Sequence, residues 1–335
     1  MCCGGGYIEV MTTPDKPRRR WLRFSLRSLF LLVLVISVSL GWTLYKVRQQ
    51  GIAVAALKEM GCSVEYDYAT SKSPEWLRKM LGEEEYNVTS VKGYHSQITD
   101  AGLVHLQGLT QLQNLDLMGT KVTDAGLVYL RGLNQLHNLD LRYTQVTDAG
   151  LVSFQGLSQL RLLYLGGTQV ADAGLAHLQG LTQLADLDLG ETQVADAGLA
   201  HLQGLPRLTN LFLGETQVSD AGLIHLQGLP ELSQLHLTGT KVTDAGLIHL
   251  QGLTQLQRLD LRYTQVTDAG IVHLRGLTKL KVLNLDGTQV TDAGIVHLRG
   301  LASLEDLGLN HTQVTAAGVK HLWKALPKCQ INYDH

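Results

Sequence analysis

Eight histidines share one position in a spacing of 24 residues, and this row of imidazoles is the first pattern in the chain that could do chemistry. They are His105, His177, His201, His225, His249, His273, His297 and His321. Zinc needs its ligands within about 2.1 Å, whereas neighbouring packed helices lie about 8 to 10 Å apart. We therefore interpret the row as partly exposed side chains on a helical face and expect no metal site.

No other motif indicates catalysis. The sequence contains no phosphate-binding glycine loop, no nucleophile elbow and no HExxH pair, and its abundant glycines fall at repeated turns. Its four cysteines, which include the adjacent Cys2 and Cys3, form neither a disulfide framework nor a metal-ligand cluster. We therefore expect a non-catalytic protein without a cofactor.

A second set of residues indicates binding. These residues are the outward positions of a repeated short strand, where side chains vary while the leucines around them do not. Aromatic side chains, which commonly anchor interfaces, gather in the middle copies, and acidic residues that include Glu191 and Glu215 border them. The predicted ligand-binding residues are Leu162, Tyr164, Asp186, Asp188, Asn210, Phe212, Gln234 and His236. A basic or amphipathic partner would fit this patch; the alternative is neutral drift on a solvent-exposed sheet face.

The element that must position these residues is LQNLDLMGTKVTDAGLVYLRGL, Leu112 to Leu133, which recurs about every 24 residues until Leu326. Leucines alternate with polar residues in its first part, which predicts a short strand. Thr123 is a plausible N-cap for the short helix that follows, and Gly132 is able to take a positive φ where that helix ends. Each copy is therefore expected to be strand, turn, short helix and turn.

Nine full copies would stack into one α/β solenoid with a shared leucine core. Parallel strands lie about 4.8 Å apart and helices about 8 to 10 Å apart, so we expect a horseshoe with its sheet on the concave face and its helices on the convex face. This pattern resembles the leucine-rich repeat family over residues 91–326, in the LxxLxLxxT form. The threonines are interpreted as structural: Thr120, Thr144, Thr168, Thr192, Thr216, Thr240, Thr264, Thr288 and Thr312.

Residues 1–27 form a basic tail, and residues 28–45 contain no charge and are long enough to cross a membrane as a helix. Six basic residues precede this segment, so the positive-inside rule predicts a cytoplasmic N-terminus and extracytoplasmic repeats. Trp21 and Trp42 flank it, which suits a retained anchor. A cleaved signal peptide is the competing interpretation, and RRRWLR weakly resembles a twin-arginine export motif.

Residues 46–90 lack the repeat and are predicted to form an N-terminal cap, with a helix ending at Gly61, a strand in SVEYDY, a helix in PEWLRKMLG and a strand in NVTSVKGY. Residues 327–335 are predicted to add a final capping strand. A basic anchor, SVEYDY, PEWLRKMLG and TDAGLxxL repeats together resemble the membrane-anchored leucine-rich repeat proteins of planctomycete bacteria.

Charge restricts the choice of partner. Residues up to Arg48 carry eight basic and two acidic side chains, which leaves 20 basic against 28 acidic in the remainder. Nucleic acid is an unsuitable partner for such a surface, because phosphate contacts need a basic face. The sequence therefore predicts a membrane-tethered module that binds a protein or cell-envelope ligand. A self-associating envelope scaffold is the main alternative. The repeats also resemble those of F-box substrate receptors, but the F-box segment is missing.

Overall fold

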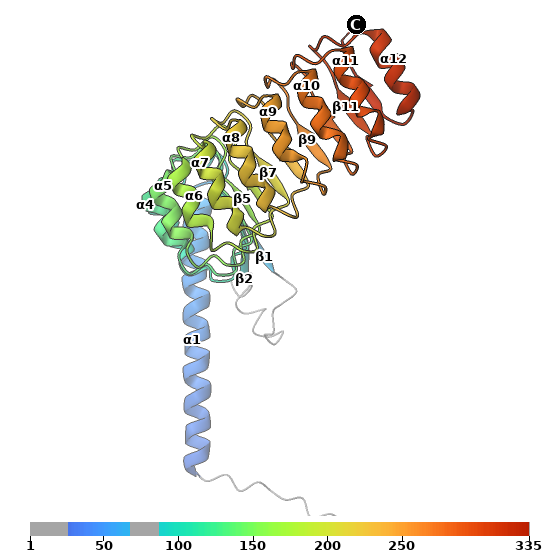
Figure 1. Ribbon diagram of the computed structural model, residues 1–335. Coiled ribbons are helices and arrows are strands. Elements are labelled where there is room, and N and C mark those ends of the chain that lie inside the picture. The colour runs from blue at the N-terminus through green and yellow to red at the C-terminus, as the bar shows by residue number, and fades with distance from the viewer. Residues whose placement is uncertain (1–25, 68–86, 335) are drawn as a thin grey trace, which may run out of the picture. The chain divides into compact units, whose positions relative to one another are not determined.

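The computed structural model describes residues 26–67 and 87–334 (Figure 1). The chain divides into two compact units, Met1–Lys46 and Val47–His335. Helix α1 (Leu26–Glu59) begins in the first unit and ends in the second. The predicted helix in PEWLRKMLG lies outside the described residues.

The part of α1 in the first unit is apolar and exposed. Its most apolar window has a mean hydropathy of 2.1, and none of that window is buried within the protein. Leu29, Phe30 and Leu31 are each more than half exposed. By length and composition α1 is able to cross a membrane, and a signal sequence near an N-terminus has the same properties.

The second unit is built on one 12-stranded sheet, in which the strands follow one another in chain order. β1 pairs with β2 in antiparallel fashion, and every later pair is parallel. The strands are β1 Ser63–Asp67, β2 Asn87–Lys92, β3 Asn114–Asp116, β4 Asn138–Asp140, β5 Leu162–Tyr164, β6 Asp186–Asp188, β7 Asn210–Phe212, β8 Gln234–His236, β9 Arg258–Asp260, β10 Val282–Asn284, β11 Asp306–Gly308 and β12 Gln330–Asn332.

Short helices lie in a row along the side of this unit opposite the strands (Figure 1). They are α3 Asp100–Leu103, α4 Asp124–Leu127, α5 Asp148–Leu151, α6 Asp172–Leu175, α7 Asp196–Leu199, α8 Asp220–Leu223, α9 Asp244–Leu247, α10 Asp268–Ile271, α11 Asp292–Ile295 and the longer α12 Ala316–Ala325. A 3-10 turn follows each of the first nine: η2 Val104–Leu106, η3 Val128–Leu130, η4 Val152–Phe154, η5 Ala176–Leu178, η6 Ala200–Gly204, η7 Ile224–Gly228, η8 Ile248–Leu250, η9 Val272–Gly276 and η10 Val296–Gly300.

The repeated leucines form one continuous core that reaches from Val54 and Leu57 in α1 to Ile331 in β12. One turn of helix and three strand residues bury too little apolar surface to be stable alone, so each repeat depends on its neighbours. The repeated threonines are structural, as predicted: Thr120 is 4% exposed, and its hydroxyl donates to the carbonyl of Leu117 at 2.7 Å. The predicted solenoid of parallel strands and short helices is confirmed.

An aspartate at the start of each short helix joins neighbouring repeats. The side chain of Asp124 accepts hydrogen bonds from the backbone N–H of Thr147 at 2.8 Å and from its hydroxyl at 2.6 Å. Thr147 in turn caps its own helix by accepting from the N–H of Ala149. Thr123 caps α4 in the same way, as predicted. Asp124 thus interacts with the next repeat, in addition to its favourable position at the helix dipole.

The residue with a positive φ lies at a different position in most repeats from the one predicted from the sequence. Gly132 has φ +89°, as predicted, but among the glycines equivalent to it only Gly156 also has a positive φ. In the described repeats the left-handed position lies instead between strand and helix, directly before the repeated threonine. It is occupied by His95, Gly119, Tyr143, Gly167, Glu191, Glu215, Gly239, Tyr263, Gly287 and His311. A tight turn after each strand forces this conformation, which costs a non-glycine residue about 1 to 2 kcal/mol.

Candidate ligand-binding site on the sheet face

Strand register places the eight predicted binding residues in two rows across β5, β6, β7 and β8. One row is Leu162, Asp186, Asn210 and Gln234, and the other is Tyr164, Asp188, Phe212 and His236. The second row continues to Asp140 on one side and to Asp260 on the other. All eight side chains are half-buried. We call the second row, from Asp140 to Asp260, the aromatic–acid row.

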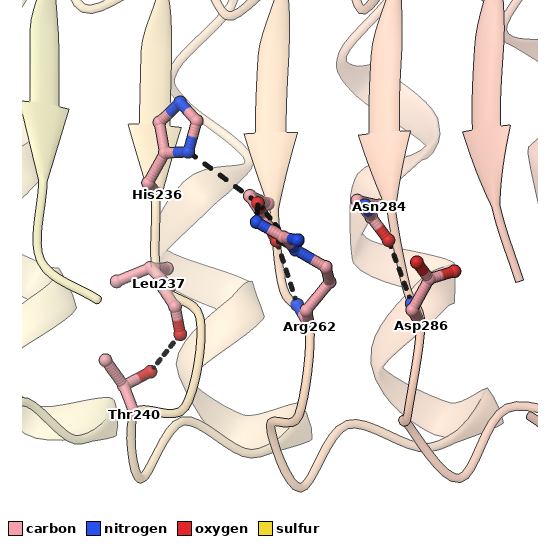
Figure 2. Close-up of polar contacts among 7 residues, drawn as sticks. His236, Leu237, Thr240, Arg262, Asn284 and Asp286 are labelled. Atoms are coloured by element: carbon pink, nitrogen blue, oxygen red, sulfur yellow. Dashed lines mark hydrogen bonds and ion pairs between the residues drawn. The ribbon is translucent and has the colours of Figure 1, made fainter. Parts of the chain in front are cut away.

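The three aspartates of the aromatic–acid row close the turns that follow their strands, a structural role that was not predicted from the sequence. The Asp188 carboxylate accepts a hydrogen bond from the N–H of Gly190 at 2.9 Å, and Asp140 and Asp260 accept equivalent bonds from residues two positions later. Asn284 makes the same bond to the N–H of Asp286 (Figure 2). Asp and Asn commonly close such turns. The Asp or Asn that ends many of the strands was the available sequence signal.

Tyr164 is held against the sheet by an arginine. The guanidinium of Arg142 binds the Asp140 carboxylate through two nitrogens, with Nε 3.0 Å from Oδ1 and Nη2 2.5 Å from Oδ2. The same guanidinium lies over the Tyr164 ring, 5.1 Å from its centroid. The two contacts fix a cation between a carboxylate and an aromatic face. This packing explains why Tyr164 is half-buried and not fully exposed.

Phe212 packs against its neighbour on the β8 side. Its ring stacks on His236, and the two ring centroids lie 4.5 Å apart. His236 Nδ1 lies 3.7 Å from Asp260 Oδ2, which also binds Arg262 at 2.7 Å (Figure 2). Burial opposes ionisation of Asp260, but the contacts from His236 and Arg262 outweigh it and hold the pKa of this carboxyl well below its usual range. His236 Nε2 is buried and has no hydrogen-bond partner within the described part of the chain.

Asp188 differs from the two arginine-bound aspartates. Residues 166, 190 and 214 are glycines at the position that Arg142 and Arg262 occupy in their own repeats. Among the described residues, no cationic group lies within ion-pairing distance of Asp188, although Arg142 exerts a longer-range attraction. Burial therefore raises the pKa of Asp188 above its usual value. Burial also raises the pKa of Asp186, whose carboxylate accepts a hydrogen bond from the Asn210 amide.

Three residues with positive φ, Tyr143, Glu191 and Glu215, belong to the repeats that carry the aromatic–acid row. The Tyr143 hydroxyl donates to the Glu191 carboxylate at 2.9 Å across the repeat between them. Gly167 occupies that intervening repeat, and a Cβ there would come within 2.3 Å of the Tyr143 ring. Glu215 similarly lies against Gly239, where a Cβ would meet its carboxylate. The predicted acidic rim therefore contains one carboxylate that is hydrogen-bonded to a tyrosine.

The histidine row lies on the helical side, on the 3-10 turns and on α12. His201 and His273 contact the side chain of a glutamine from the preceding repeat, Gln179 and Gln251 respectively. In residues 26–67 and 87–334, no group of three or more His, Cys, Asp and Glu side chains is placed to hold a metal ion.

Cys62 and Cys329 are buried free thiols at the two ends of the core.

Family comparisons agree with this architecture. Models described as leucine-rich repeat match residues 110–170, and also residues 252–274 and 276–298. The chain is a leucine-rich repeat protein. Domains of this kind are typically protein-binding modules and generally lack catalytic activity. A comparison with curated proteins finds no match.

Solved structures of leucine-rich repeat proteins are similar in fold. The chain matches a leucine-rich repeat protein of Leptospira interrogans with 23% identity and a TM-score of 0.51, over 68% of this chain and 62% of that one. It matches the mouse RP105/MD-1 complex with 20% identity and a TM-score of 0.55, over 73% of this chain. It matches the plant peptide hormone receptor RGFR1 in complex with RGF2 with 14% identity and a TM-score of 0.51, over 76%. This leucine-rich repeat chain spans 42% of each of the last two.

Proposed function

We propose that the protein is a non-catalytic, membrane-tethered recognition module that binds a protein or cell-envelope ligand through its sheet face. The observation that carries this proposal is the composition of the aromatic–acid row between Tyr164 and His236. Tyr164 and Phe212 flank Asp188, and each is supported by a neighbouring side chain on the side away from it. Aromatic side chains that are already held in place before binding are typical anchors at the centres of interfaces.

Two of the similar structures support a partner of this kind. One is a peptide hormone receptor solved with RGF2, and the other is RP105 solved as a complex with MD-1. A shared fold does not specify a ligand, so the aromatic–acid row must supply the binding specificity. We propose as binding residues the eight that strand register brings together on β5 to β8.

We propose helix α1 as the tether. Its apolar part is exposed and the basic residues lie mainly before it, which supports a cytoplasmic N-terminus with the repeats on the other side of the membrane. Residues 46–90 and 327–335 then serve as the two caps of the repeats. Membership of the membrane-anchored planctomycete subgroup remains part of this proposal. A cleaved signal sequence would produce a soluble repeat domain instead.

The alternative is an envelope scaffold that associates with itself. It is favoured by the end of the sheet, because in the described part of the chain β12 pairs on one side only, with β11. An open strand edge is able to pair with another chain. This role would use the end of the solenoid, whereas recognition would use its middle.

Site-specific photocross-linking in cells separates the two roles. The photoreactive residue p-benzoylphenylalanine replaces Phe212 on the sheet face in one variant and His225 on the helical side in the control. We expect an adduct between the chain and a different protein or envelope component from the Phe212 position and none from the control. With the same photoreactive residue at Gln330, on the open edge strand β12, adducts between two copies of the chain would favour the scaffold. Equal yields from the Phe212 and His225 positions would contradict recognition at the row.

A further inference from the structure

The chain contains its own example of a bound guanidinium. Asp140 ends β4, Tyr164 stands beside it on β5, and the Arg142 guanidinium lies between them with both contacts made. Asp260 is bound by Arg262 in the same bidentate manner (Figure 2). In both cases the arginine stands two residues after the aspartate, so the geometry is set by the repeat itself.

Asp188 and Phe212 repeat this arrangement without the cation. Asp188 ends β6 as Asp140 ends β4, and Phe212 stands beside it on β7 as Tyr164 stands beside Asp140 on β5. The position of the arginine is taken by Gly190, which has no side chain. His236 stacks on Phe212 from the β8 side, and among the described residues no other aromatic ring or cation contacts Phe212. We expect the opposite ring face, on the side of β6 and Asp188, to be available to a ligand.

Electrostatics favours a cation at this place. Asp188 is partly buried, and its carboxylate has the Gly190 N–H as its hydrogen-bond donor. Glu191 and Glu215 stand near the same strands and make no ion pair within the described residues. A guanidinium bound here would supply a positive charge next to the partly buried Asp188 carboxylate. Its planar group would also be able to lie on the Phe212 ring.

We infer that Asp188 and Phe212 bind an arginine side chain of a protein partner, in the place that Arg142 occupies two repeats earlier. This inference rests on the proposed recognition role of the sheet face and names the chemistry of its partner. The guanidinium forms two hydrogen bonds with the Asp188 carboxylate and stacks on Phe212. Lysine is a poorer ligand, because its ammonium is a compact, strongly hydrated charge without a planar face.

The test uses 19F NMR on the full chain in detergent, with 4-fluorophenylalanine in place of its four phenylalanines. The probe is Nα-acetylarginine amide, and the matched probes are the citrulline and lysine amides. We expect the Phe212 signal to shift saturably with the arginine probe, while the signal of the buried Phe154 stays constant. Citrulline has nearly the same shape without the charge and should bind at least about tenfold more weakly.

Three variants complete the experiment. Asp188→Asn should weaken arginine binding at least about tenfold, because the amide carries no charge; it keeps the turn, as Asn284 does in its own repeat. Gly190→Arg should abolish probe binding, because the new side chain occupies the site from within, and it should raise Tm. Asp116→Asn, on β3 beside Asp140 and outside the aromatic–acid row, should leave binding unchanged.

Equal binding of citrulline or lysine, or unchanged binding by Asp188→Asn, would overturn the arginine site. Retained probe binding in a folded Gly190→Arg variant would do the same. The two proposals fail separately. A Phe212 adduct with a partner but no arginine response would overturn only the arginine site, whereas an arginine response without any adduct would overturn the recognition role.

Discussion

Asp188 and Asp260 occupy the same position in their repeats, but their pKa values shift in opposite directions. Both end a strand, and both accept a hydrogen bond from the N–H two residues later. Asp260 has Arg262 and His236 around it, whereas Asp188 has glycine at the position of the arginine. The pKa of Asp260 is therefore held low, and burial raises that of Asp188.

Asp188→Asn and Asp260→Asn should therefore change the free energy of unfolding in opposite directions near pH 7. The lowered pKa of Asp260 means that its ionised form stabilises the fold above the usual aspartate pKa, and that this stabilisation is lost as pH falls. Asp260→Asn should cost about 1 to 3 kcal/mol near pH 7 and less at lower pH. The raised pKa of Asp188 means that ionisation destabilises the fold as pH rises through it, so Asp188→Asn should be stabilising near pH 7 and neutral near pH 3.

Thermal unfolding of the full chain in detergent, followed by circular dichroism at both pH values, measures this difference. Asp116→Asn serves as the control, because Asp116 closes the same kind of turn by accepting from the N–H of Met118 and has no arginine two residues later. Destabilisation of the same size by Asp188→Asn and Asp260→Asn near pH 7 would show that the turn bond alone matters and that the surrounding charges do not.

The short helices are held by contacts between repeats more than by their own helix propensity. Each of α4 to α11 is only four residues long, which is far too short to be stable by itself. The glycine in the middle of the DAGL motif allows close approach: a Cβ on Gly150 would lie 2.4 Å from Asp124 Oδ1 and 2.9 Å from Leu127 Cδ1. The same Asp124 oxygen accepts the N–H of Thr147.

Gly150→Ala therefore should destabilise the protein, although alanine is the better helix former by about 1 kcal/mol. The new methyl group would displace the Asp124 carboxylate from its two hydrogen bonds with Thr147, at a cost of about 2 to 3 kcal/mol that exceeds the propensity gain. Gly180→Ala is the matched control, because nothing lies within 4 Å of the added Cβ and the backbone there does not require glycine. Urea unfolding of the two variants measures the difference, and equal stabilities would refute this role of the glycine.

The proposed function depends on the compartment in which the repeats lie. The solenoid has one continuous core from α1 to β12, so its sheet face is presented as a single surface. That surface carries the aromatic–acid row, and the apolar part of α1 carries the proposed anchor. A partner is able to reach the row only from the compartment that contains the repeats.

Protease added to intact cells should digest the repeats, and N-terminal sequencing of the undigested protein should recover the original N-terminus. This result is expected from a retained anchor with basic residues on its cytoplasmic side. Permeabilised cells and a cytoplasmic marker protein are the controls. A mature N-terminus after Tyr45 would show a cleaved signal sequence, and full protection in intact cells would place the repeats away from the surface.

The repeated pattern of residues is enough to predict the solenoid, its short strands, the Thr123 N-cap and the two rows on its sheet face. The reason is the constant 24-residue period: equal repeats stack with equal register, so residues such as Tyr164, Asp188 and Phe212 must be neighbours. The Asp124–Thr147 contact also recurs at a constant interval, but the sequence does not reveal that the aspartate reaches forward to the next repeat.

How the side chains of these rows pack against one another could not be predicted from the repeat pattern. Arg142 turns onto Asp140 and Tyr164, His236 onto Phe212 and Asp260, and the left-handed turn places Tyr143 against Glu191. These contacts depend on rotamers and on the space that glycine leaves in an adjacent repeat, and neither is set by periodicity. Within the described part of the chain, the lack of an ion pair at Asp188 is therefore a property of the folded surface, since it depends on which neighbours reach the carboxylate.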